Sequence, residues 1–185
     1  MSLNASFPVG LVVDWQQPER IELGDDHLKN WLLDTGSLTE RVQALCHQFS
    51  LELLGQQTLT PQPNELSVLN ANGATTYQIR EILLCDNDTP WVFARSVIPQ
   101  AIIDAELSNL GCEPLGKRLF NDARFSRSPF EVGMVNAATL GFNRTAPLWG
   151  RRSVFSIEQH HMIVAEVFLP QSPAYQPDIR HEMSS

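Results

Sequence analysis

The sequence predicts an antiparallel α+β fold. Strand-like segments follow one another with short connections, whereas helical segments group elsewhere in the chain. The clearest signal is a hairpin, in which residues 86–89 separate the strand-like segments 75–85 and 90–99. At 185 residues and 43% apolar content, the chain can bury a core without a disulfide or metal staple. We therefore expect one domain over residues 1–185, with an N-terminal arm at 1–24.

The first half of the chain predicts two short helices. Asp25 and Asp26 open an amphipathic segment at 25–33, where acidic residues suit the first turn of a helix. Ser37 and Glu40 have the spacing of a capping box, so a second helix should run to about residue 47. Further predictions for this half are a short strand at 10–14, a strand at 49–58 and a proline-containing loop at 60–72.

The second half adds strands to the hairpin. A helix is expected at 100–110, ended by Gly111, and a shorter one at 114–120, opened by Pro114. The intervening segment 134–147 is rich in Gly, Asn and Thr and predicts a long loop. A flexible tail is expected at 176–185. Three more strands are predicted at 124–133, 149–157 and 162–169.

Charge and cysteine content exclude several classes of protein. The net charge of −8 argues against nucleic acid as a partner. Three cysteines without a close pair predict reduced thiols, and the absence of a leader or a long apolar run predicts a cytoplasmic protein without a membrane span. The basic residues concentrate at 80–152, and eleven of the thirteen are Arg, the side chain suited to carboxylates. This distribution indicates a small anionic ligand.

Three charged residues lie on otherwise apolar strand faces. With a two-residue turn at 87–88, paired positions of the hairpin have numbers that add to 175, which makes Arg80 and Arg95 direct cross-strand neighbours. Two opposed guanidiniums are unfavourable unless an anion lies between them or both reach solvent. Glu166 is the single carboxylate of an apolar strand and should be buried. These residues indicate either an internal Arg–Glu ion pair or an anion site with a nearby acid or base.

Other motifs carry less chemistry. The segment 111–118 is similar to a phosphate-binding loop, but Arg118 stands where a Ser or Thr would hold magnesium. His160 and His161 are adjacent, so on a strand they point to opposite faces and cannot chelate one ion. We therefore predict no metal site and no nucleotide cofactor.

Several ordered motifs span residues 25–175, among them REILLC at 80–85, ARSVIP at 94–99, PLG at 114–116, LWGRRS at 148–153 and EVFLP at 166–170. In these motifs the chain resembles the chorismate lyases. The resemblance implies a six-stranded antiparallel sheet with helices on one side and helical flaps over a buried site. It implies a monomer that converts chorismate to 4-hydroxybenzoate and pyruvate without cofactor or metal, as the first committed step towards ubiquinone.

The resemblance also assigns residues. It implies that Arg80 binds the ring carboxylate, that Glu166 meets the ring oxygen at the opposite end, and that Arg95 holds the enolpyruvyl carboxylate. Leu115 would offer a backbone contact to the ligand, and Leu38 falls where the family tends to place a flap Met. The residues themselves leave open a non-catalytic module that binds aromatic acids, since effector domains of some bacterial transcription regulators look similar in fold. A plain structural protein, with the arginines paired internally, is the remaining alternative.

Overall fold

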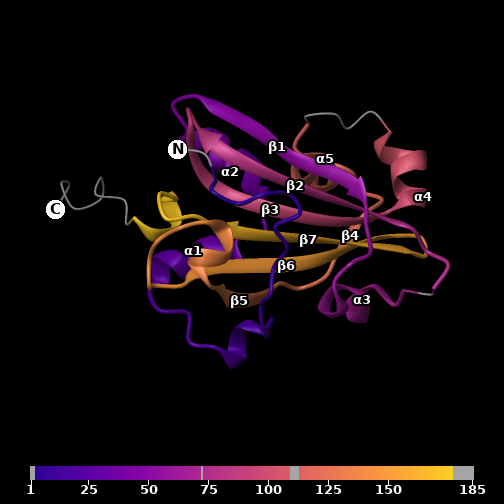
Figure 1. The fold of residues 1–185 in the computed structure, drawn as a ribbon, viewed down its shortest axis with the longest axis horizontal. Helices are drawn as coiled ribbons and strands as arrows, with labels where there is room; N and C mark the ends of the chain where they lie inside the picture. The colour runs from indigo at the N-terminus through magenta and orange to yellow at the C-terminus, as the bar shows by residue number, and fades with distance from the viewer. Residues whose placement is uncertain (1–2, 72, 109–112, 177–185) are drawn as a thin grey trace.

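The protein is built on one antiparallel sheet (Figure 1). The computed structural model describes residues 3–71, 73–108 and 113–176. Neighbouring strands follow the order β1-β2-β3-β7-β6-β4, and β5 also pairs with β6. All these pairs are antiparallel, which confirms the predicted α+β class. The strands are β1 (Phe49–Thr58), β2 (Tyr77–Asp86), β3 (Thr89–Pro99), β4 (Ser126–Arg127), β5 (Glu131–Val135), β6 (Leu148–Ile157) and β7 (His160–Phe168).

The sheet has seven strands where six were expected. The predicted strand at 124–133 forms two pieces, β4 and β5, and both pair with β6. Residues 128–130 separate them, and Pro129 in this break has no N–H to give to the ladder. The strand predicted at 124–133 is therefore present as an interrupted strand at the edge of the sheet.

The two predicted N-terminal helices are confirmed with their caps. Asp25 accepts a hydrogen bond from the Leu28 N–H, and Ser37 accepts one from the Glu40 N–H. The predicted helix at 100–110 is shorter, and its proposed end at Gly111 lies outside the described residues. The α-helices are α1 (Asp26–Leu33), α2 (Leu38–Leu45), α3 (Pro63–Leu69), α4 (Gln100–Ile102) and α5 (Leu115–Phe120); α4 continues into the π-helical turn η2 (Ile103–Leu107), and η1 (Pro18–Arg20), η3 (Ala137–Leu140) and η4 (Pro173–Tyr175) are 3-10 turns.

The two faces of the sheet have different covers. One face, here the arm face, presents alternate residues such as Leu83, Phe93 and Val167, which pack against Leu11 and Leu140. In Figure 1 the indigo N-terminal arm crosses in front of the strands on this side. The loop at 134–147 thus contributes a buried turn, η3, to the arm-face core.

The other face, here the flap face, carries most of the helices. Its side chains include Ile82, Ala94 and Phe168, which pack with Trp31 of α1 and Leu38 of α2. Further along this face, the apolar side chains of η2 and α5 pack on β3, β6 and β7. The prediction of helices on one side therefore holds for this set, whereas α3 is an exception.

Helix α3 corrects the prediction of a loop at 60–72. Gln62 and Glu65 form a reciprocal capping box, and Pro63 takes the first helical position, where its missing N–H is harmless. The prolines that indicated a loop therefore start a helix. Leu69 packs with Ile79 and Val97 on the arm face, so α3 lies across the sheet from the flaps.

The predicted strand at 10–14 is also wrong. Gly10 has φ of +72°, outside the extended region. The N–H groups of Val9 and Gly10 donate to the carboxylate of Glu81, at 2.7 and 2.9 Å, and Leu11 N–H donates to the side chain of Gln62. Side-chain acceptors therefore replace a neighbouring strand, and in the described chain the arm pairs with the sheet only by a bridge between Gln16 and Val132.

The hairpin register corrects the opposition of Arg80 and Arg95. Near the turn the predicted pairing holds, with Cys85 opposite Pro90. A bulge at Trp91 then shifts the register by one residue, so Arg80 lies opposite Ser96 and Glu81 lies opposite Arg95. Pro90 has no N–H to donate to the ladder at this point. Beyond the bulge, each β3 residue faces the side of the sheet opposite to the one that the unshifted pairing predicts relative to β2. Arg80 is therefore on the flap face and Arg95 on the arm face.

Arg95 is the centre of a buried ion cluster on the arm face. Its Nε donates to Glu65 at 2.6 Å, and its Nη1 donates to Glu81 at 2.8 Å. The side chains of Arg95 and Glu81 are 4% and 0% exposed. Burial tends to lower the pKa of Arg95, but the two carboxylates outweigh it and raise that pKa above its ordinary value. This cluster ties α3, β2, β3 and, through Glu81, the arm into one unit.

No helix among the described residues has both the length and the apolar character to cross a membrane.

Replacing Arg95 should destabilise the fold. In Arg95→Met, Glu65 and Glu81 would remain buried without their counter-ion, which should lower the free energy of unfolding by about 3–5 kcal/mol. Denaturant unfolding measures this loss. The matched control is Arg124→Met, because Arg124 also bonds two carboxylates but is 58% exposed. A loss in Arg95→Met no larger than in the control would contradict a stabilising role for the cluster.

Candidate active site

Glu166 and Arg151 form an ion pair on the flap face. They are cross-strand partners on β7 and β6, and Arg151 Nε donates to Glu166 Oε2 at 2.8 Å. Arg151 is fully buried and its Nη1 donates to the carbonyls of Trp31, Leu32 and Asp34. Glu166 is partly open, with 15% of its side chain exposed. The Arg151 guanidinium therefore fixes the position of one oxygen of the Glu166 carboxylate.

The second oxygen of Glu166 faces the start of α5. A Cβ placed on Gly116 would lie 4.0 Å from Glu166 Oε1 and 3.7 Å from the Thr39 hydroxyl. These are ordinary van der Waals distances, so the start of α5 lies next to Glu166 and α2. Within the described residues, only Oε2 of this carboxylate has a hydrogen-bond partner, so Oε1 remains available to a bound molecule.

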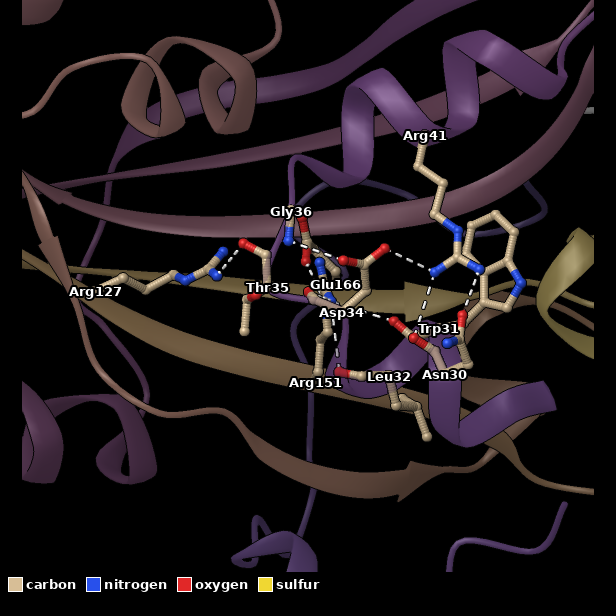
Figure 2. Close-up of polar contacts among 10 residues, drawn as sticks. All are labelled: Asn30, Trp31, Leu32, Asp34, Thr35, Gly36, Arg41, Arg127, Arg151 and Glu166. Carbon is tan, nitrogen blue, oxygen red and sulfur yellow. Dashed lines mark hydrogen bonds and ion pairs between the residues drawn. The ribbon is translucent and has the colours of Figure 1, made fainter. Parts of the chain in front are cut away.

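The loop between α1 and α2 is anchored beside this pair (Figure 2). Asp34 accepts hydrogen bonds from the Gly36 N–H and from Arg41, whose guanidinium lies 3.7 Å above the Trp31 ring. Burial tends to raise the pKa of Asp34, but the Gly36 N–H and Arg41 lower it more, so the net shift is downward. The turn at 34–36 is thus a folded connection with an ionised carboxylate at its centre.

These elements enclose a small cavity. It is lined by residues 36–39, by Gly116 and Phe120 of α5, and by Val164 and Glu166 on the sheet side. The space open to the centre of a water-sized sphere is only about 20 Å³, enough for about one ordered water molecule but not for a ring compound. The α2 and α5 helices therefore form closed flaps, and a ligand with a six-membered ring would need them to move apart.

Arg80 lies on the same face of the sheet, in the cross-strand row next to that of Glu166. Its cross-strand row continues through Ser96 and Val164 to Ser153, and the last two of these line the cavity. Arg80 is 2% exposed, and it donates to Gln56 Oε1 at 2.9 Å and to the Glu113 carbonyl just before α5 at 3.1 Å. The Arg80 guanidinium thus connects strand β2 to the residue that leads into helix α5.

The strand spacing sets the separation of Arg80 and Glu166. They are two strands and two residues apart, which corresponds to about 12 Å between their Cα atoms. Between them the face carries the short side chains of Ala94, Ser96 and Val164. The side chains between this guanidinium and this carboxylate on the same face are therefore all uncharged.

The structure thus brings four predicted site residues to one face and separates the fifth. Glu166 and Leu38 line the cavity, Leu115 begins α5 beside Gly116, and Arg80 lies one row away. Arg95 is on the arm face with two carboxylates, so its assignment to the same site is corrected by the bulge at Trp91.

Arg151 and Arg127 were missed as site residues. The β6–β7 turn lies at 158–159, and pairing outward from it places Arg151 opposite Glu166. The strands predicted at 149–157 and 162–169 imply a longer turn, which would pair Glu166 with Ser153, so the observed two-residue turn is what brings Arg151 opposite Glu166. The sequence pattern gives no comparable indication for Arg127. Only the tertiary fold brings β4 to the loop between α1 and α2, here called the flap loop, where Arg127 donates to the Thr35 carbonyl at 2.6 Å. Burial, and then the nearby Arg151, lower the pKa of Arg127 below its usual value.

Residues 3–71, 73–108 and 113–176 contain no group of three or more His, Cys, Asp or Glu side chains arranged to hold a metal ion.

Comparison with known proteins places the chain in a family. A sequence model described as chorismate lyase matches residues 11–178. A probable chorismate pyruvate-lyase from Pseudoalteromonas atlantica is 41% identical over 94% of this chain and 95% of its own length. The chain belongs to the chorismate lyase family. A second relative, a probable chorismate pyruvate-lyase from Shewanella loihica, is 38% identical over 90% of this chain and 93% of its own length.

The chorismate lyase fold is shared with more distant structures. The effector domain of PhnF from Mycobacterium smegmatis superposes with a TM-score of 0.51 at 14% identity, over 75% of this chain and 91% of that one. The C-terminal domain of the histidine utilization repressor from Pseudomonas syringae superposes with a TM-score of 0.52 at 9% identity, over 66% of this chain and 92% of that one. At these identities the likeness concerns the fold alone.

Proposed function

We propose that the protein is a chorismate lyase that converts chorismate to 4-hydroxybenzoate and pyruvate. The observation that carries the proposal is that a buried guanidinium, Arg80, and a partly open carboxylate, Glu166, lie on one face of the sheet, with the small Glu166 cavity covered by α2 and α5. Relatives named as probable chorismate pyruvate-lyases support the reaction class. The family resemblance supports a monomer that acts in the cytoplasm and supplies 4-hydroxybenzoate for ubiquinone.

The proposed ligand orientation follows from charge. Chorismate carries a ring carboxylate at one end and a ring hydroxyl at the opposite end. Arg80 would bind the ring carboxylate, because a charge-assisted contact from a buried guanidinium is strong. The hydroxyl would meet Glu166 Oε1, with the backbone at Leu115 and the side chain of Leu38 closing over the ring.

The proposed reaction is an elimination that makes the ring aromatic. The C–H bond of the ring carbon that carries the hydroxyl breaks, and its electron pair forms a double bond to the adjacent ring carbon that carries the enolpyruvyl ether. The neighbouring C–O bond breaks with its pair going to the enolpyruvyl oxygen, and the proton ends on the enolpyruvyl group as it becomes pyruvate. Glu166 would hold the hydroxyl and is the group placed to carry a proton, while the closed flaps exclude water and strengthen each charge contact.

The alternative function is a module that binds an aromatic acid without turnover. The fold shared with the PhnF effector domain is the observation that favours it. Relatives at 38–41% identity over at least 90% of the chain favour the enzyme instead. Both functions predict ligand binding, so turnover distinguishes them.

The first experiment is a direct assay. Purified protein with chorismate should produce 4-hydroxybenzoate and pyruvate in equal amounts, which chromatography and a coupled pyruvate assay measure. A no-protein control gives the spontaneous rate. Turnover at that background rate, with 4-hydroxybenzoate still raising Tm, would favour the binding module over the enzyme.

Arg80→Ala should weaken substrate binding. Losing a charge-assisted contact to the ring carboxylate should raise KM at least ~10-fold, with a smaller effect on kcat. Steady-state kinetics measure both constants, and Arg80→Lys, which keeps the charge, should recover part of the loss. Arg124→Ala on the exposed surface is the control. An unchanged KM in Arg80→Ala would remove this residue from the binding site.

Glu166→Gln should lower kcat more than it changes affinity. The amide is nearly isosteric and keeps an oxygen for Arg151, but it cannot carry a proton as a carboxylate does. Rapid single-turnover measurements, together with titration of 4-hydroxybenzoate, separate the two effects. Wild-type turnover in this variant would reduce Glu166 to a packing role.

A further inference from the structure

Arg127 places a second guanidinium at the wall of the cavity on the side of Glu166. Its side chain lines the cavity together with Arg151 and Glu166. It lies 4.6 Å from the centre of the Phe130 ring and donates to the Thr35 carbonyl at 2.6 Å. Figure 2 shows Arg127 reaching the flap loop from one side while Arg151 reaches it from below Glu166.

The two guanidiniums differ in their partners. Arg151 is neutralised by Glu166 and has three backbone carbonyls around its Nη1. Arg127 has one backbone carbonyl, and within the described parts of the chain no carboxylate lies within 4 Å of it. The cavity wall therefore carries one positive charge in excess, and a guanidinium cannot lose it by deprotonation at ordinary pH.

The shape of chorismate determines where its second carboxylate lies. The enolpyruvyl ether is on the ring carbon next to the hydroxyl, whereas the ring carboxylate is at the far end. With Arg80 at the ring carboxylate and Glu166 at the hydroxyl, the enolpyruvyl carboxylate must lie on the Glu166 side of the site. Arg95 cannot reach it, because it is buried on the opposite face with Glu65 and Glu81.

We infer that Arg127 binds the carboxylate of the enolpyruvyl group, the role that the family resemblance implied for Arg95. This inference rests on the proposed function and deepens it. Because Arg127 also contacts the Thr35 carbonyl, the same side chain joins the substrate to the loop that begins the α2 flap. Binding of the dianion and closure of the flap are then coupled through one guanidinium.

The decisive experiment compares a dianion with a monoanion. In Arg127→Gln the KM for chorismate should rise at least ~10-fold, because a charge-assisted carboxylate contact is lost. The Kd for 4-hydroxybenzoate, measured by calorimetric titration, should stay unchanged, because this product lacks the enolpyruvyl carboxylate. Arg127→Lys should recover part of the chorismate affinity. Arg124→Gln, three residues earlier and outside the cavity, is the matched control, and thermal unfolding verifies that each variant folds.

The outcomes separate this inference from the proposed function. An unchanged KM for chorismate in Arg127→Gln would overturn the inference while the enzyme assignment stands. A parallel loss of affinity for chorismate and for 4-hydroxybenzoate would also overturn it, because Arg127 would then only latch the flap to Thr35. Wild-type protein that does not turn over chorismate would overturn the proposed function, and the role of Arg127 with it.

Discussion

The bulge at Trp91 places Arg80 and Arg95 on opposite faces of the sheet, and this division of charge shapes both halves of the protein. On a pleated strand, a shift of one residue moves a side chain from one compartment to the other. On the arm face, Arg95 joins two carboxylates and holds the N-terminal arm and α3 to the sheet. On the flap face, Arg80 lies in the cross-strand row of Val164 and Ser153, which line the cavity.

The two buried clusters therefore have opposite balances. Around Arg95 the carboxylates are in excess, and backbone N–H groups of Val9 and Gly10 complete their hydrogen bonding. Around Glu166 the guanidiniums are in excess, since both Arg151 and Arg127 line the same cavity. A cluster satisfied by its own chain is suited to stability, whereas an excess of positive charge under a movable cover is suited to an anionic ligand.

The closed flaps connect the geometry to dynamics. The cavity has room for about one water molecule, so a ring compound could bind there only if the α2 and α5 helices moved apart. Two kinds of contact resist opening. Leu38 of α2 and Leu115 of α5 are buried in the apolar core, and Arg127 and Arg80 donate hydrogen bonds to the backbone carbonyls of Thr35 and Glu113. Under the proposed function, closure of this kind would protect reactive groups from water, and flap opening would contribute to the rate of product release.

Local patterns in the sequence determined much of the architecture. Alternation of apolar residues gave the strands, and the caps at Asp25 and Ser37 gave the first two helices. The charged residues on apolar strand faces were also visible, including Glu166, because periodicity is a property of neighbouring residues. The prolines at 61 and 63 were misinterpreted as a loop, since the capping box of Gln62 and Glu65 that begins α3 is less familiar than one with Ser or Thr.

Only the tertiary structure decided which of those charges meet. The bulge at Trp91 separates Arg95 from Arg80, and the pairing of β4 with β6 brings Arg127 beside a loop that lies 92 residues away in the chain. Sequence periodicity records the face on which a side chain lies relative to its near neighbours. It does not record a skipped residue in a ladder or the approach of distant segments, and both depend on packing of the whole sheet against its covers.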